Sequence, residues 1–64
     1  MKSHKNGVTT ERATVNGVYI VTLYAINELK LINAAEREQA KLYNHYNLVR
    51  TESLFSNNIT FFCE

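Results

Sequence analysis

The dipeptide Asn16-Gly17 constrains the fold of this 64-residue chain more than any other feature. It separates two segments rich in β-branched and aromatic side chains, residues 8–15 and 18–24. An Asn-Gly pair between such segments favours a type I′ turn, because both central residues of that turn need positive φ angles. The sequence therefore predicts a β-hairpin over residues 8–24.

The turn also sets the register of this hairpin. The predicted pairs are Val15–Val18, Ala13–Ile20 and Glu11–Thr22 on one face, and Thr14–Tyr19, Arg12–Val21 and Thr10–Leu23 on the other. The second strand is apolar on both faces, with Val18 and Ile20 on one side and Tyr19, Val21 and Leu23 on the other. A single helix covers one face of a small sheet, so the other face is expected to carry an apolar surface suited to a partner.

Residues 27–47 follow the 3.6-residue period of an amphipathic helix. The predicted apolar side holds Ile32, Tyr43, Leu29, Ala40, Tyr46, Ala35 and Leu42. The predicted polar side holds Asn33, Arg37, Lys30, Lys41, Asn27, Asn44 and His45. Two starting points are open, because Asn27 is a good N-cap residue and the segment from Asn33 to Glu36 resembles a capping box.

The C-terminal segment predicts a further strand or a second hairpin, since Asn57-Asn58 stands between two β-prone runs. The expected fold is therefore α+β. A small antiparallel sheet, made of an N-terminal hairpin and a C-terminal strand or hairpin, packs on one amphipathic helix in the order ββαβ(β). Residues 1–7 are expected to form a disordered basic tail, and residues 8–64 a single small domain.

Composition narrows the classes of function. The net charge of +1, with acids and bases interleaved, argues against a strong electrostatic footprint for nucleic acid or membrane. The longest apolar run, residues 18–26, is about half the length of a membrane helix, and the start of the chain is too polar for a signal peptide. The single cysteine, Cys63, fits a reducing compartment and is expected to be a half-buried hydrophobe. These features predict a cytoplasmic protein.

No residue pattern for catalysis, a metal, a cofactor or a small-molecule substrate is visible, so the chain is not expected to be an enzyme. Glu36 intrudes on the apolar side of the helix, either as a carboxyl with a raised pKa or as an ion-pair partner of Arg12 or of a lysine at the rim. His45 stands near the C-terminal end of the helix, where a positive charge suits the helix dipole. Metal-ligand spacing is not found around it.

The leading functional prediction is a small protein-binding regulator or inhibitor that self-associates through an apolar sheet face. The expected partner is a protein, a second copy of the chain, or both. Aromatic and branched side chains are favoured anchors in such contacts. The predicted contact residues are Tyr19, Val21, Leu23, Tyr43, Tyr46, Phe55 and Phe62. The size and element order resemble those of small phage or mobile-element inhibitors, a resemblance that rests on no shared motif.

The alternative prediction is a small nucleic-acid-binding regulator that uses the basic side of the helix and the N-terminal arm. Its expected contact residues are Lys2, Lys5, Arg37, Lys41, Asn44 and His45. A helix-turn-helix around Gly17 is a weaker reading, because Arg12 and Asn16 would occupy positions of the first helix that should be apolar. Its recognition helix would also be rich in β-branched residues, which read bases poorly.

Overall fold

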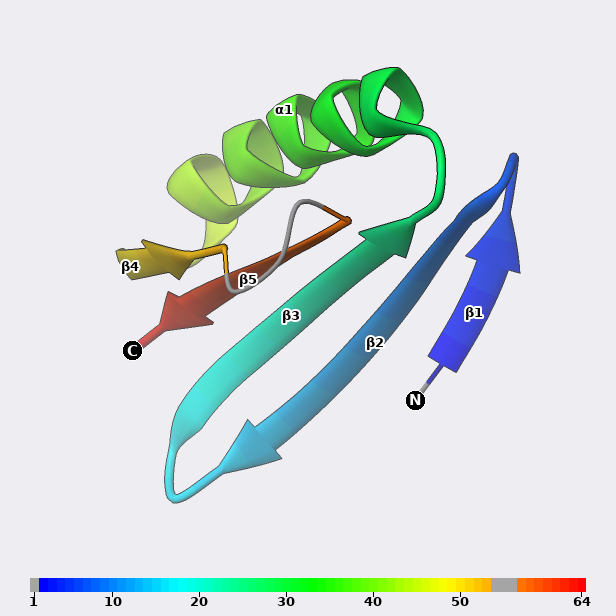
Figure 1. The fold of residues 1–64 in the computed structure, drawn as a ribbon. Coiled ribbons are helices and arrows are strands. Elements are labelled where there is room, and N and C mark those ends of the chain that lie inside the picture. The colour runs from blue at the N-terminus through cyan, green and yellow to red at the C-terminus, as the bar shows by residue number, and fades with distance from the viewer. Residues whose placement is uncertain (1, 54–56) are drawn as a thin grey trace.

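The computed structural model describes residues 2–53 and 57–64. In this part of the chain, one α-helix packs on one face of a five-stranded antiparallel sheet with the strand order β1-β2-β3-β5-β4 (Figure 1). The elements are β1 (Lys2–Lys5), β2 (Val8–Val15), β3 (Val18–Ala25), α1 (Glu28–His45), β4 (Leu48–Glu52) and β5 (Asn58–Cys63). The α+β class and the ββαβ(β) order predicted from the sequence are confirmed.

The hairpin β2–β3 has the predicted register along its whole length, from Val15 opposite Val18 to Thr10 opposite Leu23. Asn16 and Gly17 have φ angles of 51° and 81°, which is the backbone geometry that a type I′ turn requires. The local turn chemistry alone is enough to set this register.

The N-terminal segment is not a disordered tail, because Lys2–Lys5 forms strand β1 against β2. Asn6 and Gly7 have φ angles of 54° and 78°, so they form a second Asn-Gly turn like the first. All four residues of β1 are exposed at the edge of the sheet. Such a strand needs no apolar residues, and its lysines protect the edge against pairing with other chains, so its sequence lacks a strand pattern.

Helix α1 begins and ends within two residues of the predicted limits. Asn27 is its N-cap, and the Asn27 side chain accepts a hydrogen bond of 3.2 Å from the backbone N–H of Lys30. The later start at Asn33 is therefore wrong. At the other end, Tyr46 turns to extended backbone and its N–H donates to the Leu42 carbonyl.

The buried stripe of α1 differs from the predicted apolar side. The buried residues are Leu31, Ala35, Glu38 and Leu42, whereas Leu29 and Tyr43 are 72% and 64% exposed. The predicted side contained Ala35 and Leu42 of this stripe but omitted Leu31 and Glu38, and its other members lie at exposed positions. The structure buries the stripe containing Glu38 because the carboxylate has a partner on the sheet, as described below.

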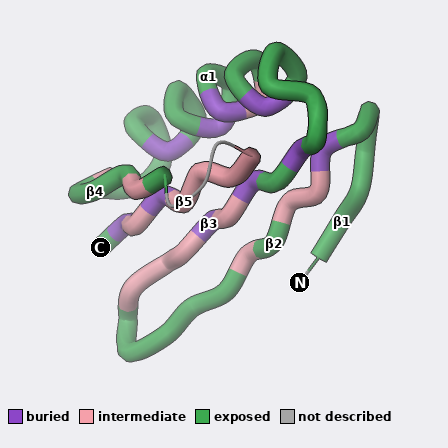
Figure 2. The backbone as a smooth tube through the Cα atoms, viewed as in Figure 1, coloured by how far each residue is buried: buried purple, intermediate pink, exposed green. Residues whose placement is uncertain are grey.

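Of the two C-terminal alternatives, the structure shows a hairpin, β4–β5, but its first strand is Leu48–Glu52. The run expected to form that strand, residues 54–56, lies outside the described residues, and Asn58 belongs to β5 and not to the turn. Strand β5 lies between β3 and β4, and a register shift between Leu48 and Arg50 interrupts its pairing with β4. The core lies between α1 and the central strands, and its largest fully buried side chains are Phe61, Leu23, Leu42, Val21 and Cys63 (Figure 2). Cys63 is 1% exposed, so it is more deeply buried than predicted.

Candidate functional site

The face of the sheet opposite α1 carries an apolar surface at the end nearest the Asn16-Gly17 turn. No helix or strand of the described chain covers this face (Figure 1). Five side chains, which we call the open-face patch, line one shallow hollow of about 530 Å³: Val15, Val18, Ile20, Val49 and Phe62. Val15 lies directly opposite Val18, and Ile20 directly opposite Phe62, so the patch is continuous across β2, β3 and β5.

Charged side chains of both signs border the open-face patch. The Arg50 guanidinium lies over the Phe62 ring, with its carbon 4.2 Å from the ring centroid. Its Nε also pairs with Glu52 Oε2 at 3.4 Å. Glu64 is the other charged residue that lines the hollow. The patch therefore has an apolar centre and a rim that holds one cation and two carboxylates.

Two of the predicted contact residues are corrected by the structure. Val21 and Leu23 are 0% and 2% exposed, because α1 covers the face of β3 on which they lie. They are core residues and are not accessible in the folded chain. The opposite set, Val18 and Ile20, occupies the open face instead. Phe62 lies in the open-face patch.

The three tyrosines among the predicted contact residues lie on the helix side or on the helix itself. Tyr19 is half-buried against the core and stacks on Tyr46, with ring centroids 4.8 Å apart. Tyr43 and Tyr46 are 64% and 51% exposed. Phe55, the remaining predicted contact residue, lies outside the described residues. The predicted set is therefore divided between two sides of the molecule and does not form one surface.

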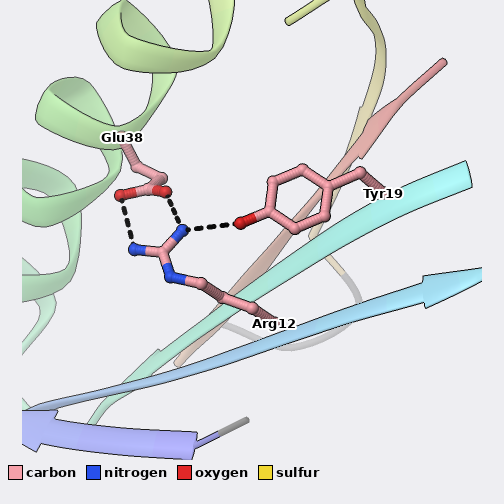
Figure 3. A network of polar contacts seen from close by, with 3 residues as sticks. All are labelled: Arg12, Tyr19 and Glu38. Carbon is pink, nitrogen blue, oxygen red and sulfur yellow. Dashed lines mark hydrogen bonds and ion pairs between the residues drawn. The ribbon is translucent and has the colours of Figure 1, made fainter. Parts of the chain in front are cut away.

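A polar network ties the helix to the sheet beside these tyrosines (Figure 3). Arg12 on β2 makes a two-pronged ion pair with Glu38 on α1, one prong being Nη2 to Oε2 at 3.3 Å, and its Nη1 donates to the Tyr19 hydroxyl at 3.4 Å. Its hydrogen bond to Glu38 raises the pKa of Arg12 well above the ordinary value. The sequence offered Glu36 as a partner for Arg12, but Glu36 is exposed and Glu38 takes that place.

A second hollow, of about 560 Å³, lies between α1 and the strands β1 and β2. It brings together three residues of the alternative nucleic-acid prediction: Lys5, Arg37 and Lys41. Lys30 joins them, although the sequence analysis placed it only on the polar side of the helix. Lys2, Asn44 and His45, the other residues of that prediction, are not among the residues that line this hollow. We call it the basic groove.

Cys63 is expected to react slowly with iodoacetamide in the folded protein. Burial, with a smaller contribution from the charge of Glu38, raises the pKa of its thiol, so little of the reactive thiolate forms near neutral pH. Mass spectrometry of timed alkylation should show labelling many times slower in buffer than in denaturant. Glutathione is the reference thiol, and native labelling as fast as that of glutathione would contradict the burial of Cys63.

Among the described residues there is no group of three or more His, Cys, Asp or Glu side chains that could hold a metal ion. Helix α1, with 18 residues, is not apolar enough to cross a membrane. No protein-family model, curated protein or solved structure matches this chain.

Proposed function

We propose that the protein is a small, non-enzymatic protein-binding regulator that self-associates through its open-face patch. The observation that carries this proposal is the continuous set of five apolar side chains on a sheet face that no element of the described chain covers. Burial of a large apolar side chain is worth about 1.5–3 kcal/mol. Association through this face is therefore favourable, whereas solvent exposure of the patch is not.

A second copy of the chain is the occupant that the patch fits best. In a two-fold contact the same surface meets itself, so the rim of one copy faces the rim of the other. The rim holds Arg50, paired with Glu52, and Glu64, which allows opposite charges to meet across the two-fold axis. A standard interface buries about 800 Å² on each partner. That area is roughly a sixth of the exposed surface of 4628 Å², which one face of the molecule can supply.

Ile20→Lys is expected to convert the dimer into a monomer. Ile20 lies in the patch between Ala13 and Phe62, and a lysine there would place two ammonium groups against an apolar surface in each dimer. Light scattering after size exclusion should give a dimer mass for the original chain and a monomer mass for the variant. Circular dichroism should show that both chains are folded, because the substituted side chain is only half-buried in the monomer.

Ile32→Lys is the matched control, since it makes the same change at a 41% exposed position on the helix. This variant is expected to remain dimeric. A monomeric original chain at high micromolar concentration would refute the proposal. The proposal would also be refuted if Ile32→Lys dissociated the dimer and Ile20→Lys did not. In that case the contact surface would be the helix.

A further inference from the structure

The basic groove lies where α1 and the sheet are not packed against each other. Helix α1 packs mainly against β3 and β5, and β1 lies at the far edge of the sheet from β4 (Figure 1). The helix therefore leaves the β1 side of its own sheet face partly uncovered. Val8 and Leu23 form part of the apolar floor, with α1 as one wall and the β1–β2 turn as the other.

Four cations from separate parts of the chain converge on this groove. Lys5 belongs to β1, whereas Lys30, Arg37 and Lys41 belong to α1, and all four are exposed. None of them makes an ion pair with a described residue. Lys30 reaches across the end of the groove to the β1–β2 turn: a Cβ atom built on Gly7 would lie 3.2 Å from its Nζ.

The acidic side chains of the described chain do not neutralise this cluster. The one carboxylate in the lining is Glu38, and its charge is already engaged by Arg12. The other five glutamates of the sequence lie elsewhere in the described structure. A chain with a net charge of only +1 thus places four unpaired positive charges around one groove. Folding, and not composition, creates this concentration of positive charge.

The arrangement suits an extended chain of negative charges better than a single small anion. Lys30, Arg37 and Lys41 lie on one side of α1, and the eleven residue-to-residue steps from the first to the last span about 16 Å along the helix axis. Asn6, Asn33 and Thr10 also line the groove and offer hydrogen bonds to phosphate or sugar oxygens. A linear phosphodiester backbone presents charges and oxygens in such a row.

We propose that the basic groove binds the phosphate backbone of single-stranded nucleic acid, without preference for sequence. A single strand is expected to contact both α1 and the β1–β2 turn, whereas a duplex is expected to contact only the rim. The lining contains no aromatic side chain among the described residues, so the contacts go to the backbone and not to stacked bases. The groove lies on the helix side of the sheet, and a dimer formed through the open-face patch leaves it accessible.

The test is fluorescence anisotropy of the full chain with a labelled mixed-sequence single-stranded DNA of about twelve nucleotides, over a series of salt concentrations. The logarithm of the affinity is expected to fall with the logarithm of the salt concentration with a slope of about −2 to −3, as for three to four phosphate contacts on a single strand. A duplex of the same length should bind more weakly.

Lys41→Glu is expected to weaken single-strand binding about tenfold and to make the salt slope shallower by about 0.7, the value for one lost contact. Lys2→Glu is the matched control, because Lys2 is an exposed lysine on β1 outside the lining of the groove. It should leave both quantities nearly unchanged. Both substituted positions are exposed, and circular dichroism should show both variants folded.

Four results would overturn the proposal. They are a lack of binding at low salt, equal losses in the two variants, tighter binding of the duplex, and binding of polyglutamate as tight as that of the DNA. The third would assign the groove to a duplex, and the fourth to an acidic protein segment. Because the Ile20→Lys monomer keeps the groove, its affinity for the single strand separates a failure of this inference from a failure of the proposed self-association.

Discussion

Phe61→Ala is expected to remove about half or more of the free energy of unfolding of the protein. Phe61 is 1% exposed and lies on β5 between Val21 of β3 and Thr51 of β4, beneath α1. Replacement of a buried phenylalanine by alanine costs about 3–5 kcal/mol, because it removes buried apolar surface and leaves a cavity. A domain of this length has a total stability of only about 3–10 kcal/mol. The substitution therefore removes much or all of the stability.

Urea unfolding followed by circular dichroism measures this loss, and the neighbouring residue provides the control. Phe62→Ala makes the same change one position later on β5, where the side chain faces the open side of the sheet and is half-buried. At concentrations low enough to avoid association, this variant should lose much less stability. Equal losses at the two positions would mean that β5 does not present Phe61 to the core and Phe62 to the open face.

Arg12→Met is expected to lower the free energy of unfolding by less than Phe61→Ala but still substantially. It leaves the carboxylate of Glu38, which is 7% exposed, without the guanidinium that compensates its charge. Removal of one partner of a buried ion pair costs about 3–5 kcal/mol. The Arg12 side chain is 36% exposed, so water reaches the pair and the expected loss is smaller, about 2–3 kcal/mol. The midpoint of urea unfolding should fall accordingly.

The double variant Arg12→Met with Glu38→Met shows whether the loss comes from the uncompensated charge. Replacement of both partners by apolar residues of similar volume leaves no charge to bury, and such changes are often neutral or stabilising. The double variant is therefore expected to be more stable than Arg12→Met alone. A double variant that is less stable than Arg12→Met would show that the ion pair contributes through packing or geometry and not through charge compensation.

The elements that local chemistry specifies are the ones that sequence analysis predicts well. The register of β2–β3 depends on the positive φ angles of Asn16 and Gly17, and the start of α1 depends on the Asn27 cap. Strand β1 is the exception, because Asn6-Gly7 forms a turn of the same kind although residues 1–7 were expected to be disordered. The sequence of β1 does not predict a strand, because a strand that is exposed along its whole length has no alternation of apolar and polar residues.

The candidate sites were predicted less well, because their residues meet through contacts that are distant in the sequence. Lys5 and Arg37 are far apart along the chain, and the basic groove exists only because α1 and the β1–β2 turn face each other. From the sequence alone, Glu38 is one more charged residue of the helix. Its burial depends on Arg12, which lies on strand β2. Neither relation has a signal in the local pattern of residues.

The residue pattern specifies the Asn16-Gly17 turn, the register of the hairpin, the amphipathic helix, and more apolar strand surface than one helix covers, but it does not reveal the turn at Asn6-Gly7. Which face of β3 packs against the helix depends on tertiary contacts. Both faces are apolar, so the period-two alternation of a strand cannot distinguish them. The choice depends on how α1 and β5 pack around Val21 and Leu23, and this packing leaves Val18 and Ile20 on the open face.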